Sequence, residues 1–285
     1  MKMTNLILTA AVVATSMFAA CSPSAIAKSY IDNNVSVSNG KESDATISKT
    51  IRISGFDEIY ATQGIKVVFT QGQNPGTAKI ATTPSAEKYL RVEVKDGTLR
   101  AFYNSKKGNV DIKGPSIIYV SSPTLNEVEL SASACLEVTT DLNVGEDLDI
   151  DISSAASATL GNVYCNEMDI EASSSARFKC GSVNGNVLKF DLSSSATANC
   201  NSFTGENLKI DVSSSAQSNC SSFKGENLMI EASSSAKTKI QNIDCRSIYV
   251  DASSLADIIL SGKTHNLSHD ISSGAKLNTQ TLQTR

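Results

Sequence analysis

The amino-acid sequence repeats one short phrase about every twenty residues. The phrase that begins at Asp211 reads Asp-Val-Ser-Ser-Ser-Ala, and it recurs with small changes before and after this point. A fixed period of this length indicates one structural unit that is stacked on copies of itself. The copies begin at Asp151, Glu171, Asp191, Asp211, Glu231, Asp251 and Asp270.

Apolar and polar residues alternate inside each repeat. Leu208, Ile210 and Val212 fall on one face of a strand, while Lys209 and Asp211 fall on the other. This period of two opposes a helix, and a hairpin meander would not place identical residues every twenty positions. We therefore expect an all-β fold, a single-chain parallel β-helix or solenoid with ~20-residue coils in register. Parallel crossovers favour the right-handed form.

Small residues mark the corners of the expected coils. The Ser triplet that follows each acidic residue predicts one corner, because Ser favours turns. A second corner is predicted at Gly185, Gly205 and Gly225.

The chain divides into four segments. Residues 1–21 are typical of a signal peptide that ends in a lipobox, and residues 22–49 indicate a flexible tether with one strand near its end. Residues 50–124 predict irregular, wider N-terminal coils, and residues 125–285 predict the regular 20-residue coils. We expect residues 50–285 to form one continuous domain.

Two sites of signal cleavage compete. The run from Phe18 to Cys21 reads Phe-Ala-Ala-Cys, which resembles a lipobox in which Cys21 is lipidated and becomes the new N-terminus. Alternatively, Ala25-Ile26-Ala27 fits ordinary secretory cleavage. Both alternatives export the protein. The first predicts a cell-envelope lipoprotein of the outer membrane, held to the membrane by its lipid, and the second a secreted protein.

Cysteines recur at one position of the repeat. Cys180, Cys200 and Cys220 are twenty residues apart, so stacked coils would place their side chains in parallel at ~4.8 Å spacing. Parallel side chains are poor geometry for a disulfide. We expect a buried ladder of free thiols, and no Cys or His spacing in the sequence indicates a zinc site.

The acidic residues that open each repeat predict a column of like charges on the surface. One interpretation is divalent cation binding, because carboxylate oxygens suit Ca²⁺. The other, which we favour, is that each carboxylate accepts hydrogen bonds from the Ser corner that follows it. The column comprises Asp151, Glu171, Asp191, Asp211, Glu231, Asp251 and Asp270.

Nothing in the sequence names a reaction or a cofactor. The net charge of -4, with acids and bases interspersed, opposes a nucleic-acid surface. A glycosidase needs two differently tuned carboxylates across a cleft, whereas the repeat acids form one line. The only histidines, His265 and His269, are expected in a polar end cap. An enzyme would need a groove with acids of the irregular half, such as Asp57, Glu58, Glu93 or Asp111.

Segments of the irregular half resemble a known bacterial family. Gly55 to Ile59 reads Gly-Phe-Asp-Glu-Ile, Gly64 to Gly72 reads Gly-Ile-Lys-Val-Val-Phe-Thr-Gln-Gly, and Val94 to Leu99 reads Val-Lys-Asp-Gly-Thr-Leu. Together with the later Ser-Ala phrases, these segments resemble the putative auto-transporter adhesin heads, or GIN head domains, of exported Bacteroidetes proteins. The resemblance covers about residues 51–270. Lys66 departs from the residue that the family name implies, so no function is carried onto it.

The resemblance implies a β-helical, export-associated domain with an adhesin role and no catalytic residue set. We therefore expect a non-enzymatic surface-interaction module that binds a glycan or a protein. An alternative is a structural envelope protein that associates with itself through its open coil ends. A carbohydrate-active enzyme is a third hypothesis.

Overall fold

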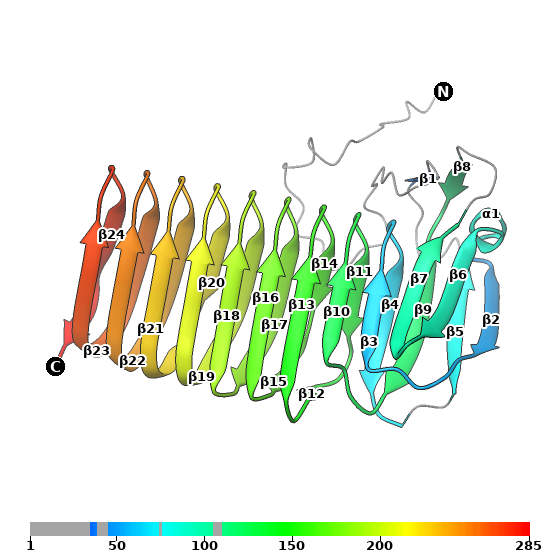
Figure 1. The fold of residues 1–285 in the computed structure, drawn as a ribbon, viewed down its shortest axis with the longest axis horizontal. Helices are drawn as coiled ribbons and strands as arrows, with labels where there is room; N and C mark the ends of the chain where they lie inside the picture. The colour runs from blue at the N-terminus through cyan, green and yellow to red at the C-terminus, as the bar shows by residue number, and fades with distance from the viewer. Residues whose placement is uncertain (1–34, 39–44, 74–75, 105–109) are drawn as a thin grey trace.

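The structure, a computed structural model, describes residues 35–38, 45–73, 76–104 and 110–285 (Figure 1). The expected signal peptide, the lipidation site at Cys21 and most of the expected tether lie outside these residues. Within residues 22–49, strand β1 (Val35–Ser38) pairs in parallel with β8 (Val110–Lys113), and β2 (Ile47–Arg52) begins. In the described part of the chain, no helix is long and apolar enough to span a membrane.

The second half of the chain is a rod of stacked parallel coils, as the repeat predicts (Figure 1). Leu208 pairs with Leu188 on one neighbouring coil and with Leu228 on the other, so identical residues lie in vertical columns. We name the strands of this stack, in which each coil contributes the strand that aligns with these leucines, the A strands. They are β10 (Glu127–Leu130), β13 (Asp147–Ile152), β16 (Glu167–Ala172), β18 (Val187–Leu192), and the C-terminal parts of β19 (Thr197–Val212), β21 (Phe223–Ala232), β22 (Lys237–Ala252) and β23 (Asp257–Ile271).

Each A strand turns at the Ser corner into a B strand, and in several coils a short third strand closes the cross-section. The B strands are β11 (Cys135–Val138), β14 (Ser157–Thr159), β17 (Arg177–Asn184), β20 (Gln217–Cys220), β24 (Lys276–Thr284) and the N-terminal parts of β19, β22 and β23. The short strands β12 (Leu142–Asn143) and β15 (Val163–Tyr164) pair with each other.

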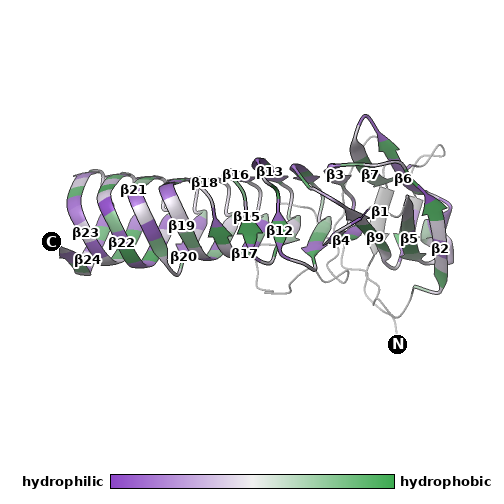
Figure 2. Ribbon diagram, turned by 90° about the horizontal axis from the view of Figure 1, so that it is seen from below, coloured by the Kyte–Doolittle hydropathy of each residue, from purple (hydrophilic) through white to green (hydrophobic). Residues whose placement is uncertain are grey.

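The core is the stack of inward columns. Hydrophilic and hydrophobic residues alternate along the strands of the C-terminal coils (Figure 2), and the inward residues of the leucine column are buried from Leu148 to Ile248 and half-buried at Leu267 in the last coil. Phe203 and Phe223 stack with ring centroids 5.7 Å apart and planes 5° from parallel. The predicted thiol ladder is confirmed, since Cys180, Cys200 and Cys220 pair in register, are buried and are free.

The Ser corner forms because two consecutive residues adopt left-handed backbone conformations. Ser214 has φ 51° and Ser215 has φ 64°. The backbone N–H of Ser215 donates to the carbonyl of Ser234 on the next coil, and Ala216 N–H donates to Ser213 O, so the turn is hydrogen-bonded both within and between coils. Short polar side chains tolerate this conformation better than bulky ones.

The glycines predicted as a second corner lie within or beside long strands. Gly205 and Gly225 belong to β19 and β21 and have no left-handed backbone. Their role is close approach: a Cβ at Gly205 would lie 1.9 Å from the carbonyl oxygen of Gly185 and 2.5 Å from a ring atom of Phe203. Only glycine allows the coils to contact each other here.

The first half departs from simple stacking, because chain order and spatial order differ. Strands β3 and β4 lie between the pair β7 and β9 on one side and β10 and β11 on the other, so the coil that comes second in the sequence lies outermost. The expected N-terminal coils are therefore irregular in their order as well as in their spacing. The bounds are β3 (Glu58–Ala61), β4 (Lys66–Gln71), β7 (Thr98–Tyr103) and β9 (Ser116–Ser122).

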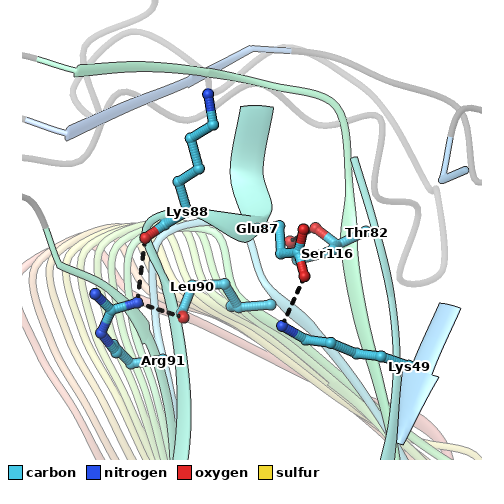
Figure 3. Close-up of polar contacts among 7 residues, drawn as sticks. All are labelled: Lys49, Thr82, Glu87, Lys88, Leu90, Arg91 and Ser116. Atoms are coloured by element: carbon cyan, nitrogen blue, oxygen red, sulfur yellow. Dashed lines mark hydrogen bonds and ion pairs between the residues drawn. The ribbon is translucent and has the colours of Figure 1, made fainter. Parts of the chain in front are cut away.

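Antiparallel strands and a short helix cover the N-terminal end of the rod. Strand β6 (Leu90–Lys95) pairs with β7, while β5 (Thr77–Thr82) pairs with β9 and β2. Helix α1 (Pro84–Glu87) follows β5. Lys49 Nζ lies 3.0 Å from Glu87 Oε1, and Arg91 donates to the carbonyls of Lys88 and Leu90 (Figure 3). These contacts join β2, α1 and β6.

The C-terminal end of the rod is open. Among the described strands, β24 pairs only with β23, and the A-strand part of β23 pairs only with β22. Leu277 and Leu282 of β24 pack against the core but remain half-buried. The two ends of the rod therefore differ in the hydrogen-bonding capacity and apolar surface that they leave free.

Candidate functional site

The outward surface of the A strands, which we call face A, has three columns of side chains. The structure stacks the predicted acidic column in register from Asp151 to Asp270. The column extends further, because Glu129 lies directly before Asp151. Tyr60 and Arg100 occupy the same column beyond Glu129.

The expected hydrogen bonds to the Ser corner are absent. The seven carboxylates that the sequence predicted are exposed, and within the described residues none forms a hydrogen bond or an ion pair. The interpretation that we favoured for the acidic column is therefore wrong. The strand alternation that places these residues on the outward face also directs their side chains away from the corner that follows.

A second outward column, two residues earlier on each A strand, changes character along the rod. Its members pass from acidic to basic and then to uncharged side chains, and the step from acid to base comes at Lys189. The column comprises Glu58, Glu127, Asp149, Asp169, Lys189, Lys209, Met229, Tyr249 and Ser268. The third column likewise begins with Asp147 and Glu167 and continues with Val187, Asn207, Asn227, Ser247 and Asn266.

The first regular coils therefore concentrate negative charge. Partial burial raises the pKa of Asp149, and the carboxylates of Asp169 and Asp147 raise it further. Burial and then Asp151 raise the pKa of Glu171 in the same way. Each charge disfavours ionisation of the next, because like charges on adjacent coils are about 5 Å apart.

Lys189 compensates for part of this charge. Its ammonium forms an ion pair with Glu167 and lies 3.5 Å from Asp169 Oδ2. The hydrogen bond to Glu167 is the main cause that raises the pKa of Lys189. Lys189 thus ends the run of acidic side chains in the second column, whose next member is Lys209.

The acidic column does not converge on a point. In the described part of the chain, no three His, Cys, Asp or Glu side chains are grouped as a metal-ion site requires. A line of parallel carboxylates offers each ion ligands from one side of a sheet, whereas Ca²⁺ takes six to eight oxygen ligands around it. The geometry therefore adds nothing in favour of the cation interpretation.

Three shallow grooves lie on the regular coils. The first, of about 250 Å³, lies on face A and includes Lys189, Lys209, Met229 and five acidic residues. The second, of about 890 Å³, lies over Gly205 and Gly225. The third, of about 770 Å³, lies on face A of the last coils and includes Met229 and Tyr249.

The acids that the enzyme hypothesis required lie apart from the three grooves of the regular coils. None of the three grooves includes Asp57, Glu58, Glu93 or Asp111. Thr98 donates to Glu58, and Asn126 Nδ2 lies 3.4 Å from Asp57 Oδ2, so these two acids take part in contacts between N-terminal coils.

The histidines and Lys66 have distinct positions. His265 and His269 are exposed on β23 near the open end, and His265 lines the second and third grooves. Lys66, where the chain departs from the family pattern, is buried on β4 and pairs with Glu137 at 2.8 Å. Its ion pair joins β4 to β11, which is a structural contact between coils.

Sequence reasoning missed two features of face A. The additional acids were visible in Asp147-Leu-Asp-Ile-Asp, because alternation places all three aspartates on one face. The uncharged groove at Met229 and Tyr249 was visible as a change within a column. It was missed because the coils were aligned by the residues that they share, and the residues that change from coil to coil at one outward position were not followed.

The comparisons with known proteins agree with this architecture. A model of the family described as "Putative auto-transporter adhesin, head GIN domain" matches residues 55–222 and 210–285. The chain has no match among curated proteins.

Several solved structures share the fold. A putative adhesin from Parabacteroides merdae is 16% identical, with a TM-score of 0.73, and the match covers 86% of this chain and 99% of that one. A putative lipid binding protein from Parabacteroides distasonis is 18% identical, with a TM-score of 0.73, covering 82% of this chain and 96% of that one. At these identities the likeness shows the fold.

Proposed function

Because the chain belongs to the family of putative auto-transporter adhesin, head GIN domains, we propose that it is a non-catalytic surface-interaction module of the cell envelope. The observation that supports this proposal most directly is face A. One strand of every coil contributes to it, so it is long, regular and exposed, with columns whose chemistry changes along the rod. A rigid rod of this kind presents side chains to a partner without a loss of backbone freedom on binding.

The arrangement of acids supports a binding role over a catalytic one. Glycoside hydrolysis needs an acid and a second carboxylate on opposite sides of the scissile bond. The carboxylates of face A instead lie side by side in columns on one surface. Lys189, a basic residue beside them, forms ion pairs with Glu167 and Asp169.

We propose that the module is exported and anchored through lipid on Cys21, with the chain before β2 between anchor and rod. The support is the Phe-Ala-Ala-Cys run that ends at Cys21. Mass spectrometry of the mature N-terminus from native membranes tests this: a diacylated Cys21 is expected. A free N-terminus at Lys28 would instead identify a secreted protein.

Binding assays test the proposed function. The fluorescently labelled mature protein is expected to bind saturably to at least one member of an array of glycans and extracellular matrix proteins. Release of reducing ends from polysaccharides is measured in parallel. Absence of binding together with release of reducing ends would overturn the proposal in favour of an enzyme.

Self-assembly is a second candidate function, and the open C-terminal end favours it. The free edges of β23 and β24 can pair with another strand, and Leu277 and Leu282 would be covered by such contact. Sedimentation should then show association that increases with concentration and is lost in Leu282→Lys. A monomer at every concentration would exclude this candidate.

A further inference from the structure

The groove on face A of the last coils differs from every other stretch of the rod. It is formed where β21, β22 and β23 lie side by side and has a volume of about 770 Å³. Its outward side chains from the second and third columns are Asn227, Met229, Ser247, Tyr249, Asn266 and Ser268, and the exposed His265 also lines it. None of these six column residues is ionised near neutral pH, whereas the second column holds an acid or a lysine in every earlier regular coil, from Glu127 to Lys209.

The groove contains an exposed aromatic ring. Tyr249 is 41% exposed and Met229, its neighbour in the same column, is 37% exposed. An aromatic ring beside a thioether is an apolar platform that water solvates poorly. The earlier members of this column are charged, so the platform is a feature of the last coils.

Polar groups with free hydrogen-bonding capacity surround this platform. Ser247 donates to Asn227 Oδ1 at 2.6 Å, and Asn227 Nδ2 donates to Asn207 Oδ1 at 2.9 Å, so the third column is a continuous hydrogen-bonded chain up to Ser247. The chain stops there. Among the described residues, the side chains of Asn266 and Ser268 have no hydrogen-bond partner, and both are exposed.

Charge beside the groove selects its ligand. The acidic column continues along one side as Glu231, Asp251 and Asp270, all exposed and without partners in the described structure. Carboxylates accept hydrogen bonds from hydroxyl groups but repel anions. The groove thus combines an apolar ring, neutral amide and hydroxyl groups, and acceptors that exclude negative charge.

We propose that this groove binds neutral saccharides. The C–H face of a pyranose ring lies on Tyr249, the amide of Asn266 and the hydroxyl of Ser268 contact its hydroxyls, and the acidic column excludes sialylated, uronic and sulfated glycans. This inference rests on the proposed surface-interaction function and names its ligand class and site.

The groove of about 250 Å³ on the same face allows a comparison of binding within one protein. It has the same acidic column and shares Met229, but its other members of the second column are Lys189 and Lys209, where the last coils have Tyr249 and Ser268. Stacking on a sugar is not available there. The proposal therefore predicts that saccharide binding depends on the last coils and not on face A in general.

The test compares two exposed tyrosines. Binding of the mature protein to neutral, sialylated and sulfated glycans is measured on an array, and the affinity for neutral members by calorimetry. Tyr249→Ala is expected to lower that affinity about tenfold, the upper range of an aromatic contact. Tyr249→Phe should retain most of it. Tyr164, 43% exposed on β15 away from face A, provides the matched control Tyr164→Ala, which should bind as the unchanged protein does.

The outcomes separate this proposal from the one on which it rests. Glycan binding that survives Tyr249→Ala, or a preference for anionic glycans, would overturn the groove proposal and leave the surface-interaction function in place. Binding of matrix proteins with no glycan binding would do the same. Absence of any binding together with polysaccharide turnover would overturn both. Circular dichroism of each variant shows that the loss is not unfolding.

Discussion

The glycine column makes a sharp prediction about coil packing. A Cβ placed on Gly225 would lie 2.0 Å from the carbonyl oxygen of Gly205 and 2.8 Å from two ring atoms of Phe223. Ordinary contacts begin near 3.4 Å, so the backbones of two coils would have to separate by about 1.4 Å. We expect Gly225→Ala to lower the free energy of unfolding by about 3 kcal/mol, the upper part of the range for overpacking, because backbone cannot rotate away as a side chain can.

The assay is urea unfolding followed by circular dichroism, since the chain has no Trp to report by fluorescence. In a thermal scan the same change lowers the midpoint by about 6–12 °C. Gly72→Ala is the matched control: a Cβ there meets nothing within 4 Å and its backbone is unstrained, so its effect should stay within about 0.5 kcal/mol. Equal effects at the two glycines would refute the reasoning.

The chain itself suggests how to rescue this variant. In the two coils that follow, the ring is absent and larger residues replace glycine: Ile243 accompanies Cys245, and Gly262 accompanies Thr264, in the columns of Phe223 and Gly225. Combining Phe223→Ile with Gly225→Cys reproduces the pair in the following coil. The double variant should therefore lose less stability than the sum of the two single changes.

Three further predictions follow from the columns and corners. Ser215→Gly should raise the free energy of unfolding by about 0.5–1 kcal/mol in urea melts, because it removes left-handed strain at φ 64°, whereas Ser215→Val should lower it. Burial raises the pKa of four acids of face A, Glu127, Glu129, Asp149 and Glu171, so the folded chain holds more protons than the unfolded chain in the range just above ~4. The melting temperature at fixed salt should therefore rise as the pH falls from neutral towards ~5. A fall in the melting temperature would contradict the assignment of these raised pKa values. Burial raises the pKa of Cys165 to about 11. Hydrogen bonds to the preceding thiol of the ladder, and then burial, hold the pKa values of Cys200 and Cys220 well above the usual value. Iodoacetamide near pH 8 should therefore modify these thiols only after unfolding, as mass spectrometry can show.

The regular coils were predictable because each stacking position must accept a copy of itself. Leu188, Leu208 and Leu228 fill one buried column, and the alternation of the sequence already placed them together. The thiol ladder followed from the same spacing. In these coils the repeat period also gives the contacts between coils, since the partner of each residue lies one period away in the sequence.

The order of the N-terminal coils was not predictable in this way. Strand β7 pairs with β3 across forty residues and β10 pairs with β3 across nearly seventy, and alternation gives no indication of partner. The acidic column shows a similar limit. Its position was predicted, but whether Asp211 reaches a backbone N–H depends on the direction of its side chain relative to the corner, and the structure directs it outward into solvent.

The most conspicuous repeat is therefore the part least informative about binding. The phrase that ends in Ser-Ser-Ser-Ala recurs because the left-handed corner and the buried column after it must be built in every coil. Outward positions are free of that requirement, so the coils can differ there without disturbing the stack. In the second column the sequence Lys209, Met229, Tyr249, Ser268 breaks the pattern within three coils, at the place where the hydrogen-bonded chain of the third column also stops. A saccharide bound at Tyr249, as proposed above, would account for the change in the second column at this place.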